Sequence, residues 1–327
     1  MTPRVSVIIA TYNRAHLLKT AIDSVLTQAY RDLEVIVADD GSTDGTAELV
    51  RSYGGRVRYL YQENQGKSVM LNKALAVAAG EWTAFLDSDD YWLPEKLKWQ
   101  FRAIEQFKEQ NCGACFTNGQ FVNNPHMDTT LFEFHGRKYE QTMGILANPV
   151  RTFAESPAGV SVVTLLCRTE LVRKAGGFDP KLRFTEDYDF VFRLALVTNY
   201  CYVNLPLVIV DRTVASVRHT GVSAIWDRID FRLDCEQHRY EKWLRLTTEF
   251  PSDVRKIILR QLRAVHSGKA NWFFEQQQYE MAQRELSVAV KYQPTLNLVV
   301  KWILGRVSPR VARGLVLKRG GFSPEVF

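Results

Sequence analysis

Three short apolar runs, each followed directly by polar side chains, constrain the fold of this chain more than any other feature. They span 5–10, 33–38 and 82–86, with a weaker strand candidate at 57–61. The first two are rich in β-branched residues and almost continuously apolar, which is typical of parallel strands buried on both faces. Apolar residues at helical spacing separate the runs and predict helices over 15–28, 43–53 and 68–79. This alternation predicts a doubly wound, mainly parallel sheet flanked by helices.

Polar clusters follow these runs. Thr11–Arg14 come after the first run, Asp39 and Asp40 after the second, and Asp87–Asp90 after the third. Because ligands of such folds bind where the carboxyl ends of the parallel strands meet, we expect the three clusters to lie close together. The last cluster holds three carboxylates, which cannot be buried without a large desolvation cost. It must therefore face water, a cation or a charged ligand.

A divalent cation fits this acidic cluster. Side chains two residues apart at a strand end point to the same side, so Asp87 and Asp89 can approach one ion. Mg²⁺ and Mn²⁺ prefer oxygen ligands and commonly share them with substrate phosphates. A solvated acidic turn is the more frequent explanation of such a run, so the prediction depends on the neighbouring clusters.

Five motifs occur in order along the chain: VSVIIATYNR (5–14), VADDGSTD (37–44), GEWTAFLDSDD (80–90), GGFD (176–179) and TEDYD (185–189). In order and approximate spacing they resemble the motifs of the inverting nucleotide-sugar glycosyltransferases of family 2, which have the GT-A fold. The likeness spans Pro3 to His219. It implies a metal-dependent enzyme that transfers a sugar from a nucleoside diphosphate, expected to be UDP, to a hydroxyl of a glycan, a lipid-linked glycan or a protein. It also implies Mn²⁺ or Mg²⁺ as the cofactor.

The same resemblance assigns the residues around the metal. It makes Asp89 a metal ligand and lets His219 complete the coordination, although a lone histidine is more often structural. Asp87 would contact the ribose or a metal ligand. Asp90 would either orient Asp89 or cap a helix expected over 93–110. A metal bound here would stabilise, as a Lewis acid, the charge that builds on the departing nucleotide.

The first two motifs are expected to hold the nucleoside. The carboxylate of Asp40 can accept a hydrogen bond from the imide N–H of uracil or from a hydroxyl, and the resemblance gives it the base-binding role with Asp39 in support. A turn with a helix cap is the alternative for these two acids. Thr11 and Tyr12 are expected to hydrogen-bond to the nucleoside and to stack on it. Arg14 contacts the donor or only caps the helix that follows it.

Basic residues are the candidates for the diphosphate. Lys67 is expected at a helix amino terminus, where phosphate binding is favoured, and a solvated surface lysine is an equal alternative. Arg218 is a second candidate, with which Arg212 competes. Asn72 is a buried polar anchor or a contact to the donor, and the sequence does not rank these two interpretations.

The TEDYD motif is expected to supply the base. An inverting transfer needs a carboxylate that deprotonates the acceptor hydroxyl as it attacks the anomeric carbon opposite the diphosphate. The resemblance makes Asp187 this base and gives Glu186 contact with the acceptor. Acids in the first turn of a helix are also favoured by the helix dipole alone, and that structural explanation is preferred for Asp189.

The chain is expected to comprise a catalytic domain, 1–224, and a helical extension, 225–327. The extension carries 18 Lys and Arg against 11 Asp and Glu. Its segment 261–294 has the apolar spacing of a helical hairpin and resembles a single tetratricopeptide-type unit. Segment 296–317 mixes apolar and basic residues without an acid, which is the composition of a helix lying on anionic lipid. The alternative is a solvated basic face opposite an apolar face that packs on the core.

Cysteine usage and apolar runs bear on the location. The only close cysteine pair, Cys112 and Cys115, lacks the second pair or the histidines of a zinc site. All five cysteines are expected to be small core residues in a reducing cytoplasm. Met1–Arg4 does not resemble a signal peptide, and no apolar run approaches the roughly 18 residues that cross a bilayer. We expect a cytoplasmic protein, peripheral to the inner face of the membrane where the basic tail binds lipid, and no nucleic-acid partner.

Two other functions are compatible with parts of the sequence. A nucleotidyltransferase would carry a Gly-rich, basic triphosphate loop after the first strand, but Ala10–Arg14 occupy that position. A catalytically inactive sugar-nucleotide-binding or scaffold protein would not need both Asp89 and Asp187. The sequence leaves the donor sugar, the acceptor, the linkage and the oligomeric state open.

Overall fold

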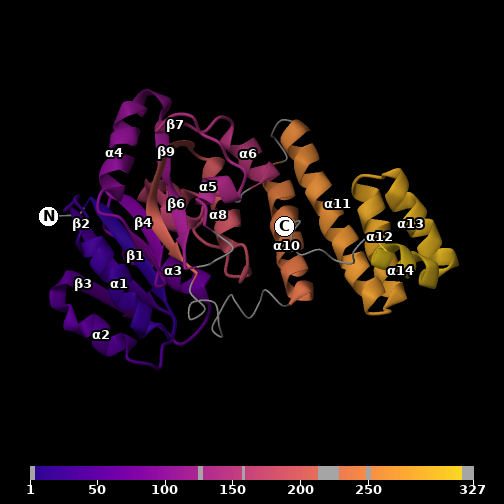
Figure 1. Cartoon of the computed structure of the whole chain (residues 1–327), viewed down its shortest axis with the longest axis horizontal. Coiled ribbons are helices and arrows are strands. Elements are labelled where there is room, and N and C mark those ends of the chain that lie inside the picture. Colours follow the sequence, from indigo (N-terminus) through magenta and orange to yellow (C-terminus); the bar gives the residue numbers. More distant parts are fainter. Residues whose placement is uncertain (1–3, 124–127, 157–158, 213–227, 248–251, 319–327) are drawn as a thin grey trace. The chain divides into compact units, whose positions relative to one another are not determined.

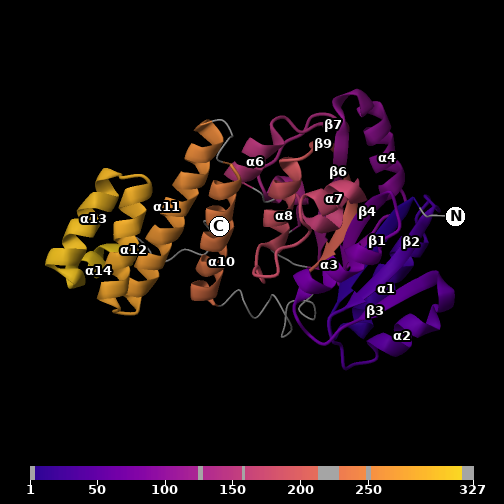
Figure 2. The ribbon, with the colours of Figure 1, turned by 180° about the vertical axis from the view of Figure 1, so that it is seen from behind.

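The computed structural model describes residues 4–123, 128–156, 159–212, 228–247 and 252–318 (Figure 1). The chain divides into two compact units, Met1–Ser223 and Ala224–Phe327. The first unit is built around one sheet, and the second consists of helices. Figure 2 shows the same ribbon from behind.

The first four strands form the parallel half of the sheet. Their order is β3-β2-β1-β4, and the polar residues that follow them lie at one edge because the strands pair in register. Thr11 pairs with Asp39, and Ala10 pairs with Asp87. The doubly wound arrangement expected from the sequence is confirmed here. The strands are β1 (Val5–Thr11), β2 (Leu33–Asp39), β3 (Val57–Tyr61) and β4 (Trp82–Asp87).

The other strands make the sheet mixed. Strand β8 runs antiparallel to both β4 and β6, β6 runs parallel to β9, and β5 and β7 run antiparallel to β9. The whole is a mainly parallel sheet flanked by helices, as predicted. These strands are β5 (Asp90–Trp92), β6 (Cys112–Val122), β7 (Met143–Ile145), β8 (Leu165–Arg168) and β9 (Asn199–Asp211).

The helices of this unit begin close to the predicted positions. Helix α1 buries Leu18, Ile22 and Val25 in a hydrophobic cluster that also contains Val7 and Val35. Burial of this apolar stripe provides the main driving force for packing the helix on the sheet. The helices are α1 (Ala15–Leu26), α2 (Thr46–Ser52), α3 (Lys67–Val77), α4 (Lys96–Gln106), α5 (Leu131–Phe134), α6 (Pro149–Glu155), α7 (Thr169–Lys174) and α8 (Glu186–Ala195).

The segment after the acidic cluster differs from the prediction. A helix was expected over 97–110, or from 93 if Asp90 capped it; α4 begins at Lys96, and Asp90–Trp92 form strand β5 on β9. The indole N–H of Trp92 donates to the carbonyl of Val163, 3.1 Å away. This long-range pairing leaves Asp90 in a strand, so its interpretation as a helix cap is wrong.

The second unit contains five helices in the part of the chain that is described. Helices α11 and α12 pack as the predicted hairpin through Ala270, Phe274, Ala282, Leu286 and Ala289. None of the described helices is both long and apolar enough to span a membrane. The helices are α10 (Ile229–Leu246), α11 (Ser252–Glu275), α12 (Tyr279–Tyr292), α13 (Leu296–Val307) and α14 (Pro309–Lys318).

Candidate active site

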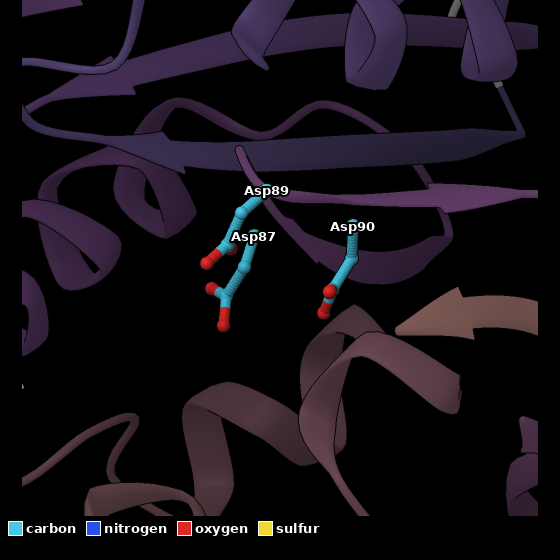
Figure 3. Close-up of side chains that lie close together, drawn as sticks. All are labelled: Asp87, Asp89 and Asp90. Carbon is cyan, nitrogen blue, oxygen red and sulfur yellow. The ribbon is translucent and has the colours of Figure 1, made fainter. Parts of the chain in front are cut away.

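Three carboxylates gather at the end of β4. One oxygen from each of Asp87, Asp89 and Asp90 lies within 4.8 Å of the others. Figure 3 shows the side chains of Asp87 and Asp89 next to each other, with Asp90 beside them on the same side of the strand end. Carboxylate oxygens at this spacing suit a hard divalent cation, so the donor set fits Mg²⁺ or Mn²⁺.

Two basic side chains contact this cluster. Nη1 of Arg14 lies 2.5 Å from Oδ2 of Asp89, and Nζ of Lys67 lies 2.7 Å from Oδ1 of Asp87. Lys67 also lies 3.7 Å from a carboxylate oxygen of Glu186, at the start of α8. Burial disfavours the charged lysine, but the carboxylates of Asp87 and Glu186 raise the pKa of Lys67 above its ordinary value.

These contacts decide two alternatives that the sequence left open. Lys67 is not a solvated surface lysine, because it bridges two carboxylates. Arg14 occupies the residue before α1, but its side chain makes no capping hydrogen bond to that helix. Both cations belong to the acidic site.

Asp90 differs from the other two acids in its surroundings. It is buried, and the backbone N–H of Asp211 donates to its Oδ1 at 3.3 Å. Burial and the nearby Asp89 carboxylate raise its pKa well above the ordinary value, while the charge of Arg212 opposes that shift. Arg212 also favours the ionised form of Asp87, together with Lys67 and Arg14. The site thus carries three cationic side chains that balance its acids.

The Asp40 carboxylate is held by the loop that leads into α3. It accepts hydrogen bonds from Nε2 of Gln62 at 2.6 Å, from the N–H of Gln65 at 3.0 Å and from the N–H of Gly66 at 2.9 Å. Asp40 is therefore not a helix cap. It fixes the loop that positions Lys67, and the base-binding role expected for it stays a prediction.

Its neighbour Asp39 holds the turn after β2. Asp39 accepts from the hydroxyl of Tyr59 at 2.6 Å and from the N–H of Ser42 at 2.8 Å. Gly41 directly follows Asp40 and has a φ of +95°. A Cβ on this residue would lie 2.7 Å from the backbone nitrogen of Asn64. Only glycine allows this close approach of the two loops. The partners Tyr59 and Gln62 carry no motif, and no signal in the sequence indicated them.

The expected base lies in the first turn of α8. Asp187 is partly exposed, and burial together with the adjacent Glu186 raises its pKa to about 7, against the opposing charge of Lys67. The preceding residue, Thr185, has a φ of +63°. Such a conformation is strained for a β-branched residue. The hydroxyl of Thr185 is buried and has no hydrogen-bond partner among the described residues.

Asp189 is structural, as preferred from the sequence. It is fully buried and forms an ion pair with Arg193 at 2.7 Å. Arg193 also donates to the carbonyls of Ala175 and Gly177. This network ties α8 to the two-glycine turn that follows α7.

Asn72 of α3 binds the same turn. Its Oδ1 accepts from the N–H of Phe178 and its Nδ2 donates to the carbonyl of Phe178, both at 2.8 Å. A Cβ on Gly177 would lie 2.4 Å from the Asn72 oxygen. Asn72 is therefore a polar anchor, which settles the choice that its sequence context left open.

The remaining predicted residues are placed in part. Thr11 is buried, and its hydroxyl lacks a hydrogen-bond partner in the described part of the chain, while Tyr12 is half-buried. Arg218 and His219 lie outside the described residues, so their expected roles stay predictions. The described geometry brings together the residues from five separate segments: Arg14, Lys67, Asp87, Asp89, Asp90, Glu186, Asp187 and Arg212.

A mainly parallel sheet flanked by helices, with carboxylates at its strand ends, has the architecture of the GT-A fold. Residues 6–162, just under half of the chain, match the model of the family described as glycosyl transferase family 2.

Relatives by sequence are named as glycosyltransferases. The uncharacterized glycosyltransferase RT0329 of Rickettsia typhi is 30% identical over 198 residues, which cover 61% of this chain and 60% of that protein. The putative teichuronic acid biosynthesis glycosyltransferase TuaG of Bacillus subtilis is 41% identical over 119 residues, covering 35% of this chain and 46% of that protein. The aligned segment thus spans about 60% or less of the length of these relatives.

Solved structures share the fold over nearly the whole chain. TarS 1-349 of S. aureus in complex with UDP-GlcNAc superposes with a TM-score of 0.71 at 19% identity, covering 97% of this chain and 92% of that one. The mannosyltransferase PcManGT of Pyrobaculum calidifontis in complex with GDP-Man and Mn²⁺ gives a TM-score of 0.56 at 21% identity, covering 97% and 87%. At these identities the likeness establishes the fold, which is of the GT-A type.

Proposed function

We propose that this chain is a metal-dependent inverting glycosyltransferase. It transfers a sugar from a nucleoside diphosphate, with UDP as the expected nucleotide, to a hydroxyl of a glycan, a lipid-linked glycan or a protein. The match of residues 6–162 to the glycosyl transferase family 2 model supports the reaction class, and the neighbours TarS and PcManGT were solved with UDP-GlcNAc and GDP-Man. The carrying observation is that Lys67 contacts Asp87 and Glu186 at once, so the metal cluster and the acidic pair on α8 lie within reach of one side chain.

The acidic cluster is the proposed metal site. Asp89 would bind the cation, with Asp87 and Asp90 close enough to complete or orient the coordination. When bound, the cation acts as a Lewis acid toward the diphosphate. Arg14 and Lys67 can turn to the phosphate oxygens, because they already lie at the carboxylates of Asp89 and Asp87, and Arg218 stays a further candidate.

Asp187 is the proposed base. Its carboxylate takes the proton of the acceptor hydroxyl while the hydroxyl oxygen forms a bond to the anomeric carbon. The bond between that carbon and the diphosphate oxygen breaks, and the nucleoside diphosphate leaves with the electron pair. A carboxylate whose pKa is raised to about 7 is half-ionised at neutral pH, which suits a general base.

The proposal is tested by separating catalysis from binding. Asp187→Asn is expected to lower turnover between about a hundredfold and ten-thousandfold, while the affinity for UDP with Mn²⁺ stays near that of the unchanged protein. Asp89→Asn is expected to weaken the metal-dependent binding of UDP, measured by calorimetry. Asp32→Asn, at an exposed position beside the amino end of β2, is the matched control.

Each outcome has a clear meaning. Unchanged turnover in Asp187→Asn would overturn the assignment of the base. An unchanged protein that binds nucleotide sugars in a thermal-shift screen but neither transfers nor hydrolyses any of them would favour the inactive sugar-nucleotide-binding protein instead. The same screen, run with Mn²⁺, identifies the donor.

A further inference from the structure

Helix α13 exposes a stripe of aliphatic side chains. Leu296, Val300, Ile303 and Val307 follow one another at spacings of four, three and four residues, which is one face of a helix. Their exposed fractions are 81%, 43%, 47% and 78%, and Val311 of α14 is also exposed. We call these five residues the aliphatic stripe. Contiguous exposed apolar patches of this kind mark interaction sites in proteins.

The opposite face of α13 fixes the orientation of the stripe. Leu298 and Gly305 are buried against the core of the second unit. The indole N–H of Trp302 donates to Oγ of Ser287 at 2.9 Å, and Nε2 of Gln283 donates to the carbonyl of Trp302 at 3.0 Å. Leu298, Trp302 and Gly305, which do not belong to the aliphatic stripe, thus form the face of α13 that packs on the core of the second unit. The aliphatic stripe is a second apolar face, without a partner among the described residues of its unit.

The charged side chains of α13 and α14 themselves are all basic, while Glu280 of α12 lines a pocket together with Arg306. The sequence has no Asp or Glu from Leu286 to Pro324. Within this stretch, Arg306 and Arg310 are exposed next to Val307 and Val311, respectively. Exposed aliphatic side chains next to exposed arginines of the same two helices complement a surface that is apolar inside and anionic outside.

We propose that the aliphatic stripe is a docking surface for an anionic lipid membrane. Helix α13 would lie in the plane of the interface, with its aliphatic side chains in the boundary between headgroups and acyl chains. Arg306 and Arg310 would contact the lipid phosphates. A helix of 12 residues is about 18 Å long, so it lies on the bilayer and does not cross it.

A second copy of the chain fits this surface less well. In a two-fold symmetric contact through the stripe, the same patch faces itself, which would bring Arg306 and Arg310 of both copies together, and α13 and α14 carry no acid to pair with them. The membrane proposal does not rest on the proposed sugar transfer, because it uses only residues of the second unit. Together with the proposed sugar transfer, membrane binding has a consequence for function: an enzyme held at a membrane is concentrated where lipid-linked acceptors are.

The test is vesicle flotation with the full chain. The protein is expected to float with vesicles of phosphatidylcholine and phosphatidylglycerol but not with phosphatidylcholine alone. Raising the salt from about 0.1 M to about 1 M shortens the Debye length from about 10 Å to about 3 Å and is expected to weaken the binding. The triple variant Val300→Ser, Ile303→Ser, Val307→Ser is expected to lose at least about tenfold in affinity.

Two matched controls separate the stripe from general surface effects. Met281→Ser removes an exposed apolar side chain from α12, outside the stripe, and is expected to leave binding unchanged. Arg306→Gln with Arg310→Gln is expected to weaken binding to the anionic vesicles, whereas Lys98→Gln, on the exposed face of α4, is not. Circular dichroism melts of all variants should match the unchanged protein, because every substituted side chain is exposed.

Three results would overturn the proposal. The first is the absence of binding to anionic vesicles. The second is equal binding to neutral and anionic vesicles, which would remove the basis for the charge argument. The third is a dimer, detected by light scattering, that the triple serine variant dissociates, because this would make the stripe an interface between two chains.

Discussion

The guanidinium of Arg14 and the carboxylate of Asp89 form an ion pair of 2.5 Å that joins the start of α1 to the turn after β4. Lys67 makes the equivalent contact with Asp87. Two of the three carboxylates that could hold a cation are therefore already neutralised by side chains of the chain itself. A metal that binds Asp89 competes with Arg14 for the carboxylate, and a released Arg14 becomes available to the diphosphate.

This pairing predicts the behaviour of Arg14→Gln. Without nucleotide, the variant is expected to bind Mn²⁺ about fivefold more tightly, since losing a competing, partly buried ion pair corresponds to about 1 kcal/mol. With UDP present the affinity should fall, because a cation for the diphosphate is missing. Calorimetry measures the affinity for Mn²⁺ with and without UDP, and Arg51→Gln on the exposed face of α2 is the control. Weaker binding of Mn²⁺ alone would show that Arg14 supports the metal instead of competing with it.

The raised pKa of Asp187 predicts the pH dependence of the reaction. The base acts in its ionised form, so kcat/KM is expected to fall with decreasing pH, with a midpoint near the pKa of about 7. Lys67→Met should move this midpoint to higher pH, because the lysine charge favours the ionised carboxylate. Lys73→Met, on the exposed side of α3, should not move it. A midpoint near pH 4 in the unchanged protein would exclude Asp187 as the titrating base.

The burial of Lys96 predicts an unusual dependence of the protein's stability on pH. Its side chain is fully buried, with Nζ 2.9 Å from Gln100 and 3.9 Å above the ring of Trp92. Burial lowers its pKa from 10.5 to about 7. Between these values the folded state binds fewer protons than the unfolded state, so stability rises with pH. The free-energy cost of burying the charged lysine is fully present below pH 7 and amounts to several kcal/mol.

Lys96→Met removes this penalty. The variant is expected to be more stable than the unchanged protein at pH 7, and its stability should vary less between pH 7 and pH 10. Denaturant titrations at several pH values measure the free energy of unfolding. Lys98→Met, at an exposed position two residues on, is the control and should change neither quantity. An equally steep pH dependence in Lys96→Met would mean that another group is responsible.

Two acids of α8 that lie two residues apart are expected to behave in opposite ways. Asp189→Asn breaks a buried ion pair and leaves Arg193 uncompensated, which costs about 3–5 kcal/mol of stability. Asp187→Asn removes a carboxylate that burial disfavours, so the thermal midpoint should stay the same or rise. Thermal unfolding of both variants gives the comparison. Equal losses would contradict the structural assignment of Asp189 and the catalytic proposal for Asp187 together.

The sequence identified the segments that form the acidic site but not their contacts. The register of β1 with β2 and β4 follows from apolar runs that each end in a polar residue, and it brings Thr11, Asp39 and Asp87 to one edge. Whether Lys67 is solvated or bridges two acids depends on α8, which is distant in the sequence. No local pattern encodes that neighbour.

Short segments whose structure depends on a distant partner were predicted least well. Residues 90–92 were not predicted as a strand but form β5, because β9 offers them backbone partners. The helix α5 (Leu131–Phe134) was not predicted from the sequence. A capping box between Thr130 and Glu133 marks its start and was a usable local signal that the prediction did not include.

By itself, the sequence determined the alternation of strands and helices, the acids at the strand ends, and the basic, acid-free stretch of the tail, because periodicity and composition are local properties. Only the tertiary structure decided that Arg14 pairs with Asp89, that Asp189 is locked by Arg193 while Asp187 titrates near neutrality, and that the aliphatic side chains of α13 face outward. Ion pairing and desolvation depend on which side chains surround a group. These neighbours come from distant parts of the chain and are set only when it folds.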